Sequence, residues 1–259
     1  MSKMNVLLLL LFAIIIDSGL VTATWAQTEV DSLLQLADER FNNMEEEEAL
    51  NLYLEVLEKD RNNFTALWNV SLLFAREGYR KDDEEKKREL YKRALYYGEK
   101  SILMYPDSGQ SHYVYAVANG RLSDLAEKNE RIRKSHIIKK HIDTAVKNNP
   151  DYAPAWHLYG VWHSNIANIS NVKRFAANIV SEGLPSGASN EKAKEYLQKA
   201  IELDPDQILF RIDLAKHYRS IGQEKNAEQE LRELLELEPQ IKDDPKLLNE
   251  ARRMLENIQ

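Results

Sequence analysis

The sequence predicts an all-α protein, a right-handed superhelix built from repeated helix-turn-helix pairs. The first observation behind this prediction is the spacing of prolines, each of which closes an apolar helical run. They are Pro106, Pro150, Pro205 and Pro239. The last two lie 34 residues apart, which is the length of a known helix-turn-helix repeat. Proline ends a helix because it has no N–H with which to continue the hydrogen-bond ladder.

The second observation is a pattern of large, small and aromatic residues ahead of these runs. Trp156, Tyr159, Gly160 and His163 give the fullest copy of a W-x2-L-G-x2-Y motif. Gly160 and Ala193 are small where two antiparallel helices must approach closely, and Trp156 is expected to fill the gap toward the next pair. The pattern and the period together predict a tetratricopeptide-like repeat domain over residues 27–259.

Carrying the same pattern along the chain predicts about five helix pairs. They cover residues 28–60, 64–104, 110–148, 154–203 and 208–237, and a capping helix follows at 244–258. The first pair is degenerate, because Arg61 stands where the proline is expected. Its acidic run over residues 45–48 is interpreted as a helix start, since negative charge there complements the helix dipole, rather than as a calcium site.

The middle of the chain is longer than the repeat requires. Pro150 and Pro205 are separated by 55 residues, and most of the excess is assigned to an insert over residues 165–190. Within it, residues 175–180 could form a short apolar helix, whereas the Gly-Leu-Pro-Ser-Gly run at 183–187 is typical of a loop. An apolar helix must bury its face somewhere. One possibility left open is that the insert fills the concave groove of the superhelix.

The N-terminus has the features of a secretory signal. Lys3 supplies a positive charge, residues 6–16 are apolar, and Thr24-Trp25-Ala26 is a small-x-small cleavage site before Gln27. Eleven apolar residues are too few to cross a hydrocarbon core of about 30 Å. We therefore expect a signal peptide over 1–26 and an exported protein, periplasmic or secreted. The alternative is a protein anchored to a membrane by residues 6–26.

Composition and motifs argue against an enzyme. The net charge of −7 makes nucleic acid a poor default partner, and the absence of cysteine excludes disulfides, thiolate metal sites and cysteine nucleophiles. Neither a phosphate-binding glycine loop nor an H-E-x-x-H metal motif is present. No catalytic residue, metal site or cofactor is predicted. We expect a protein or peptide partner, while the oligomeric state stays open.

The candidate binding site is the concave surface, which positions 5 and 9 of each first helix should line. These positions are occupied by Trp68, Leu72, Tyr113, Val117, His157, Val161, Ile212 and Lys216. A clamp for a peptide's C-terminal carboxylate would need lysine, arginine and asparagine there. Since most of these side chains are aromatic or aliphatic, the sequence predicts a groove that buries apolar side chains of a partner.

A second candidate surface is basic. Arg133, Lys140 and Lys147 recur every seven residues in the second helix of the third pair. Such a stripe is either the solvated back of a helix or a patch for an acidic protein surface.

One part of the chain resembles a known family. The segments that carry this resemblance are Ser-His-Ile-Ile-Lys-Lys-His-Ile at 135–142, Trp156 to Trp162, Lys-Arg-Phe-Ala at 173–176 and Leu-Pro-Ser at 184–186. Over roughly residues 90–237, the chain resembles the core of the regulator of microtubule dynamics family. The resemblance implies a tetratricopeptide-like helical fold and, for eukaryotic members, association with microtubules and organelle membranes. We therefore expect an exported, non-catalytic protein-interaction scaffold. The alternative is a membrane- or microtubule-associated regulator of that type.

Overall fold

The structure is a computed structural model that describes residues 27–170, 172–174 and 183–258. Throughout these ranges the chain forms helices, turns and loops, and no strand occurs in them, so the all-α prediction is confirmed. The expected signal peptide over 1–26 and the expected short helix over 175–180 lie outside the described residues.

The chain divides into two compact units, one ending at Ala66 and one beginning at Leu67. The first contains a helix over residues 27–42 and α2 (Glu46–Lys59). The Tyr53 hydroxyl donates a hydrogen bond of 2.5 Å to the carboxylate of Asp38, which joins the two helices. Glu45 is the N-cap residue of α2, and three glutamates occupy its first turn. The acidic run therefore starts a helix, as expected.

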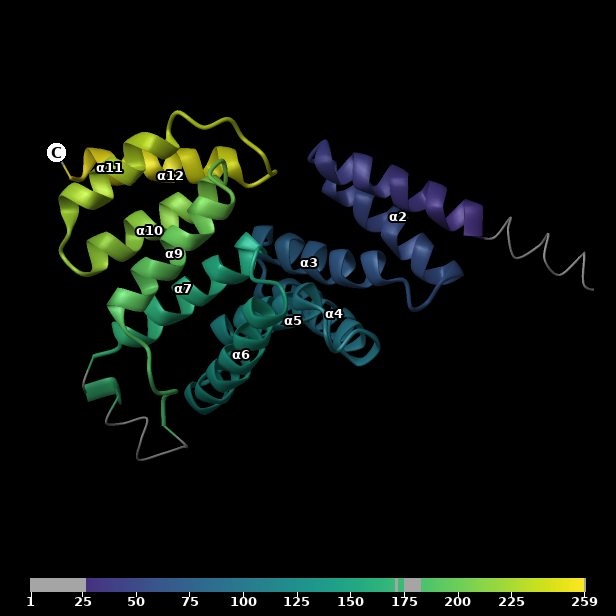
Figure 1. The fold of residues 1–259 in the computed structure, drawn as a ribbon, viewed down its shortest axis with the longest axis horizontal. Coiled ribbons are helices and arrows are strands. Elements are labelled where there is room, and N and C mark those ends of the chain that lie inside the picture. Colours follow the sequence, from purple (N-terminus) through teal and green to yellow (C-terminus); the bar gives the residue numbers. More distant parts are fainter. Residues whose placement is uncertain (1–26, 171, 175–182, 259) are drawn as a thin grey trace, which may run out of the picture. The chain divides into compact units, whose positions relative to one another are not determined.

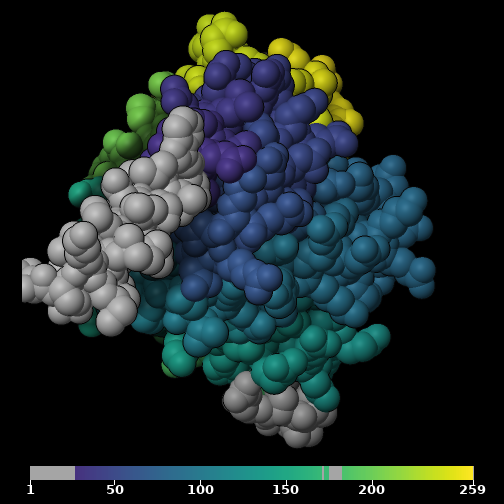
Figure 2. Space-filling view, turned by 90° about the vertical axis from the view of Figure 1, so that its right-hand side faces the viewer, coloured from purple at the N-terminus to yellow at the C-terminus, as the bar shows by residue number. Residues whose placement is uncertain are grey.

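The second unit contains the remaining helix pairs (Figure 1). After α3 (Phe64–Arg80), which crosses the division, they are α4 (Glu84–Met104), α5 (Gly109–Asp124), α6 (Lys128–Asn148), α7 (Ala153–Ala167), α9 (Asn190–Leu203), α10 (Ile208–Ser220), α11 (Glu224–Leu234) and α12 (Asp244–Glu256). From α4 onward, neighbouring helices in this order pack on one another. Helix α3 contacts α4 through the Ser71 hydroxyl, which donates a hydrogen bond of 2.8 Å to the Ala94 carbonyl. On one face of the unit the blue and teal side chains of α4, α5 and α6 form a continuous surface (Figure 2).

The prolines mark helix ends as expected. Helices α4, α6 and α9 each end two residues before their proline, at Met104, Asn148 and Leu203. Helix α11 ends earlier, at Leu234, and a turn separates it from Pro239. At the first three sites the chain leaves the helix just before a residue that cannot continue the hydrogen-bond ladder.

Close helix crossings depend on glycine. A methyl group placed on Gly160 of α7 would lie 2.6 Å from Cγ and 2.9 Å from the backbone nitrogen of Leu197 in α9. Real carbon contacts are not that short, so only glycine permits this approach. The same principle applies at Gly98 of α4, where an added methyl would lie 3.2 Å from the backbone of Tyr115.

The C-terminal end of the second unit is closed by α12. Leu247, Leu248 and Ala251 are buried in a cluster with Ile212 and Leu231, so α12 covers the apolar side of the last pair as a capping helix does. The connector before α12 also reaches the first helix of the unit. The Arg80 guanidinium donates two hydrogen bonds, of 2.8 and 2.9 Å, to the Asp243 carboxylate.

Candidate binding groove

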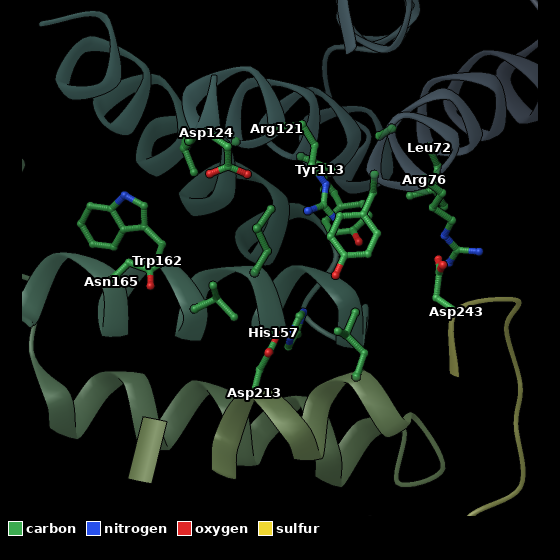
Figure 3. A pocket seen from close by; sticks show the side chains of 18 of the residues that line it. Leu72, Arg76, Tyr113, Arg121, Asp124, His157, Trp162, Asn165, Asp213 and Asp243 are labelled. Atoms are coloured by element: carbon green, nitrogen blue, oxygen red, sulfur yellow. Dashed lines mark hydrogen bonds and ion pairs between the residues drawn. The ribbon is translucent and has the colours of Figure 1, made fainter. Parts of the chain in front are cut away.

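The first helices of successive pairs surround one cavity of about 360 Å³ (Figure 3). Helices α3, α5, α7 and α10 contribute to its wall, together with the connector that precedes α12. Six of the eight residues predicted for the groove line it: Leu72, Tyr113, Val117, His157, Val161 and Lys216. The structure thus gathers into one cavity residues spread over more than half the chain.

Two of the predicted groove residues lie elsewhere. Ile212 is completely buried in the core between α10 and its neighbours, and its neighbour Asp213 lines the cavity instead, with Leu209 one turn before it. Trp68 is half-buried on α3 but does not line the cavity. On α10 the prediction was displaced by one residue, which is a rotation of about 100° around a helix.

The cavity is more highly charged than the sequence predicted. Three cationic side chains line it, Arg76, Arg121 and Lys216, and so do three carboxylates, Asp124, Asp213 and Asp243. Among them only Lys216 was foreseen. The sequence does contain a pattern that could have predicted the two arginines. Arg76 follows Leu72 by four residues and Arg121 follows Val117 by four, so each continues the helix face of a predicted groove residue. The sequence predicted mostly aromatic and aliphatic side chains in the groove, and these two arginines add charge that it did not predict.

One polar network on the wall is neutralised internally. His157 Nε2 lies 2.9 Å from Asp213 Oδ2, and Lys216 Nζ lies 3.3 Å from the other oxygen. Burial alone would raise the pKa of Asp213, but the hydrogen bond and charge of His157 and the charge of Lys216 outweigh it, so that pKa is lowered. Lys216 also pairs with Glu250 at 3.2 Å. The charges and hydrogen-bonding groups of these side chains are therefore paired with one another, and the pairs link α7, α10 and α12.

Aromatic and aliphatic side chains form the rest of the wall and pack behind it. His157 stacks on Phe210, with ring centroids 4.7 Å apart, and Tyr113 meets the ring of Tyr152 edge-on. Leu158 and Val161 of α7 also line the cavity and are partly buried. An entering ligand would therefore meet an apolar surface between charged groups.

The insert makes little contribution among its described residues. Of these, only Asn165 lines the cavity, while Leu184 packs on the core between α6 and α7, and the Gly183 carbonyl lies 2.9 Å from His136 Nε2. Gly183 and Gly187 have φ of 77° and 83°, a backbone that favours glycine, so this stretch is a loop as expected.

The basic stripe lies on the exposed side of α6. Arg133, Lys140 and Lys147 are all exposed, and Arg133 comes within 3.7 Å of Glu130. None of the three lines the cavity. Partner binding there stays a prediction.

Neither a metal-binding cluster nor a membrane-spanning helix occurs in the part of the chain that the structure describes. There, no group of three or more histidine, aspartate or glutamate side chains is arranged to hold a metal ion. Over the same residues, no helix is long and apolar enough to cross a bilayer.

Repeated helix pairs around a concave cavity define the tetratricopeptide class. Solved structures agree on the fold. A thermophilic tetratricopeptide protein from Thermus thermophilus superimposes with a TM-score of 0.64 at 21% identity, over 87% of this chain and 98% of that one. The pilF protein of Pseudomonas aeruginosa gives a TM-score of 0.51 at 14% identity, over 90% of each chain.

Within that class, the chain belongs to the regulator of microtubule dynamics family, because the family model for regulator of microtubule dynamics protein 1-3 matches residues 33–259. Regulator of microtubule dynamics protein 1 of Bos taurus is 25% identical over 94% of this chain and 77% of its own length. The Mus musculus protein 1 is 27% identical over 75% of this chain and 62% of its own. Protein 3 of Bos taurus is 27% identical, but only 47% of its length is covered.

Proposed function

We propose that this protein is a non-catalytic scaffold that binds an extended segment of a partner protein in the cavity between α3, α5, α7 and α10. The observation that carries the proposal is the convergence of side chains from four successive helix pairs on one cavity of about 360 Å³. Pockets of this size bind ligands when an apolar wall carries a few placed polar groups. A tetratricopeptide-like fold supports protein interaction as the coarse function.

The lining favours a chain that is mainly apolar where it enters. Leu158, Val161 and Val117 supply aliphatic surface, and the network of Asp213 with His157 and Lys216 is already satisfied. Burying apolar side chains against such a wall is favourable, at roughly 25 cal/mol per Å² removed from water. Apolar contacts should therefore supply most of the affinity.

The test uses acetylated, C-terminally amidated nonapeptides with leucine at positions 3 and 7 and a varied residue at position 5. In an extended chain these three side chains share one face. Binding to the full chain is measured by fluorescence anisotropy at low and high salt. Val161→Arg, which fills the cavity, and Tyr113→Ala should each weaken binding about tenfold or more, since apolar anchors dominate such interfaces.

Lys140→Ala is the matched control, because Lys140 is exposed on α6 outside the cavity. Circular dichroism confirms that each variant is folded. If Lys140→Ala alone weakens binding and high salt abolishes it, the basic stripe is the working surface and the groove proposal is wrong. If no peptide binds, it is also wrong.

A second candidate function follows from family membership. The curated relatives are named regulators of microtubule dynamics, which supports a microtubule- or membrane-associated regulator as the alternative. Cosedimentation of the full chain with polymerised tubulin tests it. Arg133→Glu and Lys140→Glu should weaken cosedimentation if the basic stripe binds an acidic surface of the partner. Export of the mature chain is part of the first proposal and would separate it from cytoplasmic tubulin.

A further inference from the structure

Arg121 is an unusual cation in the groove. It lies in the last turn of α5, where the helix dipole favours positive charge, and its guanidinium stands 4.5 Å over the centroid of the Tyr79 ring. It is half-buried. Yet none of its guanidinium N–H groups hydrogen-bonds to another residue within the described ranges. Its donors are thus left for something that enters the cavity.

The Tyr113 hydroxyl lies in the same part of the cavity. Tyr113 precedes Arg121 by eight residues on α5, and both point into the cavity (Figure 3). Its hydroxyl has no hydrogen-bond partner among the residues that the structure describes. Burial raises the pKa of Tyr113, whereas the charges of Arg76 and Arg121 act to lower it, so both guanidinium groups lie within electrostatic reach of its hydroxyl.

The carboxylates of the cavity do not satisfy these donors. Asp243 accepts both hydrogen bonds of Arg80, and Asp213 is bound by His157 and Lys216. Burial raises the pKa of Asp124, three residues after Arg121, and Arg121 lies near enough that its charge acts to lower that pKa, but among the described residues no hydrogen bond joins the two side chains. Within the described residues, the Arg121 guanidinium and the Tyr113 hydroxyl therefore both have hydrogen-bond donors without an acceptor. A carboxylate supplies two acceptor oxygens and forms charge-assisted hydrogen bonds with such donors.

We propose that Arg121 and Tyr113 form a carboxylate-binding subsite in the groove, and that the partner fills it with an aspartate or glutamate side chain. This inference rests on the proposed function, because it names the chemistry that the same groove recognises. Leu158 and Val161 then contact the aliphatic side chains that flank the acid.

Two features select a side-chain carboxylate over other anions. Asp124, Asp213 and Asp243 line the same cavity, so a phosphate dianion would be repelled more strongly than a single carboxylate charge. The lining also crosses several successive helix pairs, along which an extended chain can lie and turn alternate side chains inward. The carboxylate is then one of those inward side chains, and a free chain end is not needed.

The experiment uses the nonapeptide library above, with position 5 occupied by glutamate, glutamine, lysine or phosphoserine. A fifth peptide carries glutamine at position 5 and a free C-terminal carboxylate. The full chain should bind the glutamate peptide about 10- to 100-fold more tightly than the glutamine peptide, the range expected for hydrogen bonds to a charged group.

Variants assign that preference to residues. Arg121→Gln should abolish the preference for glutamate, so that the glutamate and glutamine peptides bind this variant with equal affinity. Tyr113→Phe, which removes only the hydroxyl, should reduce the preference several-fold. Arg133→Gln is the control, because Arg133 is an exposed arginine outside the cavity, and it should change nothing.

Each other outcome overturns the inference. A preference for phosphoserine, lysine, glutamine or the free C-terminus would show that the subsite recognises something else, and a glutamate preference that survives Arg121→Gln would place it elsewhere. If all five peptides bind equally and Val161→Arg abolishes binding, the groove stands and only the subsite fails. If none binds, both proposals fail.

Discussion

Gly160 shows how a single residue sets the approach of two helices. Its α-carbon lies where any side chain would meet both the side chain and the backbone of Leu197. Backbone atoms cannot move aside as a flexible side chain does, so α7 and α9 would have to separate. Because the wall of the cavity is built on α7, such a shift would also disturb His157 and Val161.

We expect Gly160→Leu to lower the free energy of unfolding by about 2 kcal/mol or more, since overpacking typically costs about 1–3 kcal/mol. Lys86→Ala is the control, because Lys86 is exposed on α4, and it should cost less than about 0.5 kcal/mol. Chemical denaturation followed by circular dichroism measures both. Equal losses in the two variants would contradict the packing seen at Gly160.

His163 gives the second residue-scale prediction. It is almost fully buried, and its Nδ1 accepts a hydrogen bond from the Ser189 backbone N–H at 3.2 Å, so the neutral ring carries its proton on Nε2. Burial lowers the pKa of His163 to about 4, and the nearby charges of Lys192 and Lys139 add to the effect. Protonation would place a second proton on Nδ1, opposite the Ser189 N–H, and break this contact.

In the unfolded chain the pKa of this histidine is about 6.5. Below that pH the unfolded state binds a proton that the folded state does not, so stability is complete above about pH 6.5 and falls as pH drops toward 4. The loss from His163 is roughly 3 kcal/mol across that window. His163→Phe should flatten the dependence of unfolding free energy on pH between 4 and 6.5. An unchanged slope would contradict this assignment. His141, whose pKa burial also lowers to about 4, and His217, whose pKa burial lowers as well, contribute to the slope that remains.

At the scale of elements, the start of α9 depends on Ser189. Its hydroxyl accepts a hydrogen bond from the Lys192 backbone N–H at 3.2 Å, and its own N–H binds His163 of α7. One residue thus ends the insert, caps α9 and holds α9 to α7. The helix start is set by this cap because the first N–H groups of a helix have no partner inside it.

Ser189→Ala should lower the free energy of unfolding by about 1 kcal/mol, the usual cost of losing an N-cap. Ser186→Ala serves as the control, because Ser186 is exposed in the same loop and should be close to neutral. Thermal unfolding of the two variants beside the parent gives the comparison. A neutral Ser189→Ala would mean that α9 begins by some other interaction.

At the scale of the whole molecule, one prediction concerns its N-terminus. If residues 1–26 are a secretory signal, mature protein purified from its host should begin near Gln27, because the apolar run ends before a small-x-small site. Mass spectrometry of the intact protein and Edman sequencing measure this. Mature protein that retains Met1 would favour the anchored alternative.

Much of the fold could be predicted because repeat proteins are built from local contacts. The prolines, the small residues at crossings and the 3.6-residue apolar period act between helices that follow one another, so the sequence predicted the helix pairs and their ends. Six groove residues followed from counting positions within each first helix. Ile212 was misplaced because counting fixes a helix face only to within one residue, and one residue rotates a side chain by about 100°.

By itself, then, the sequence determined the repeat, the all-α fold, the cap at α12 and most of the apolar groove. The tertiary structure alone decided which charges share the cavity and which of them are satisfied. Asp243 reaches Arg80 across 163 positions of sequence, and Asp213 of α10 reaches His157 of α7 across 56. Contacts over such separations depend on the accumulated rotation of successive pairs and on the length of each insert. No local pattern records that sum. The spacing of Arg121 from Val117 could have placed it on the groove face, but only the folded chain shows which charges surround its guanidinium.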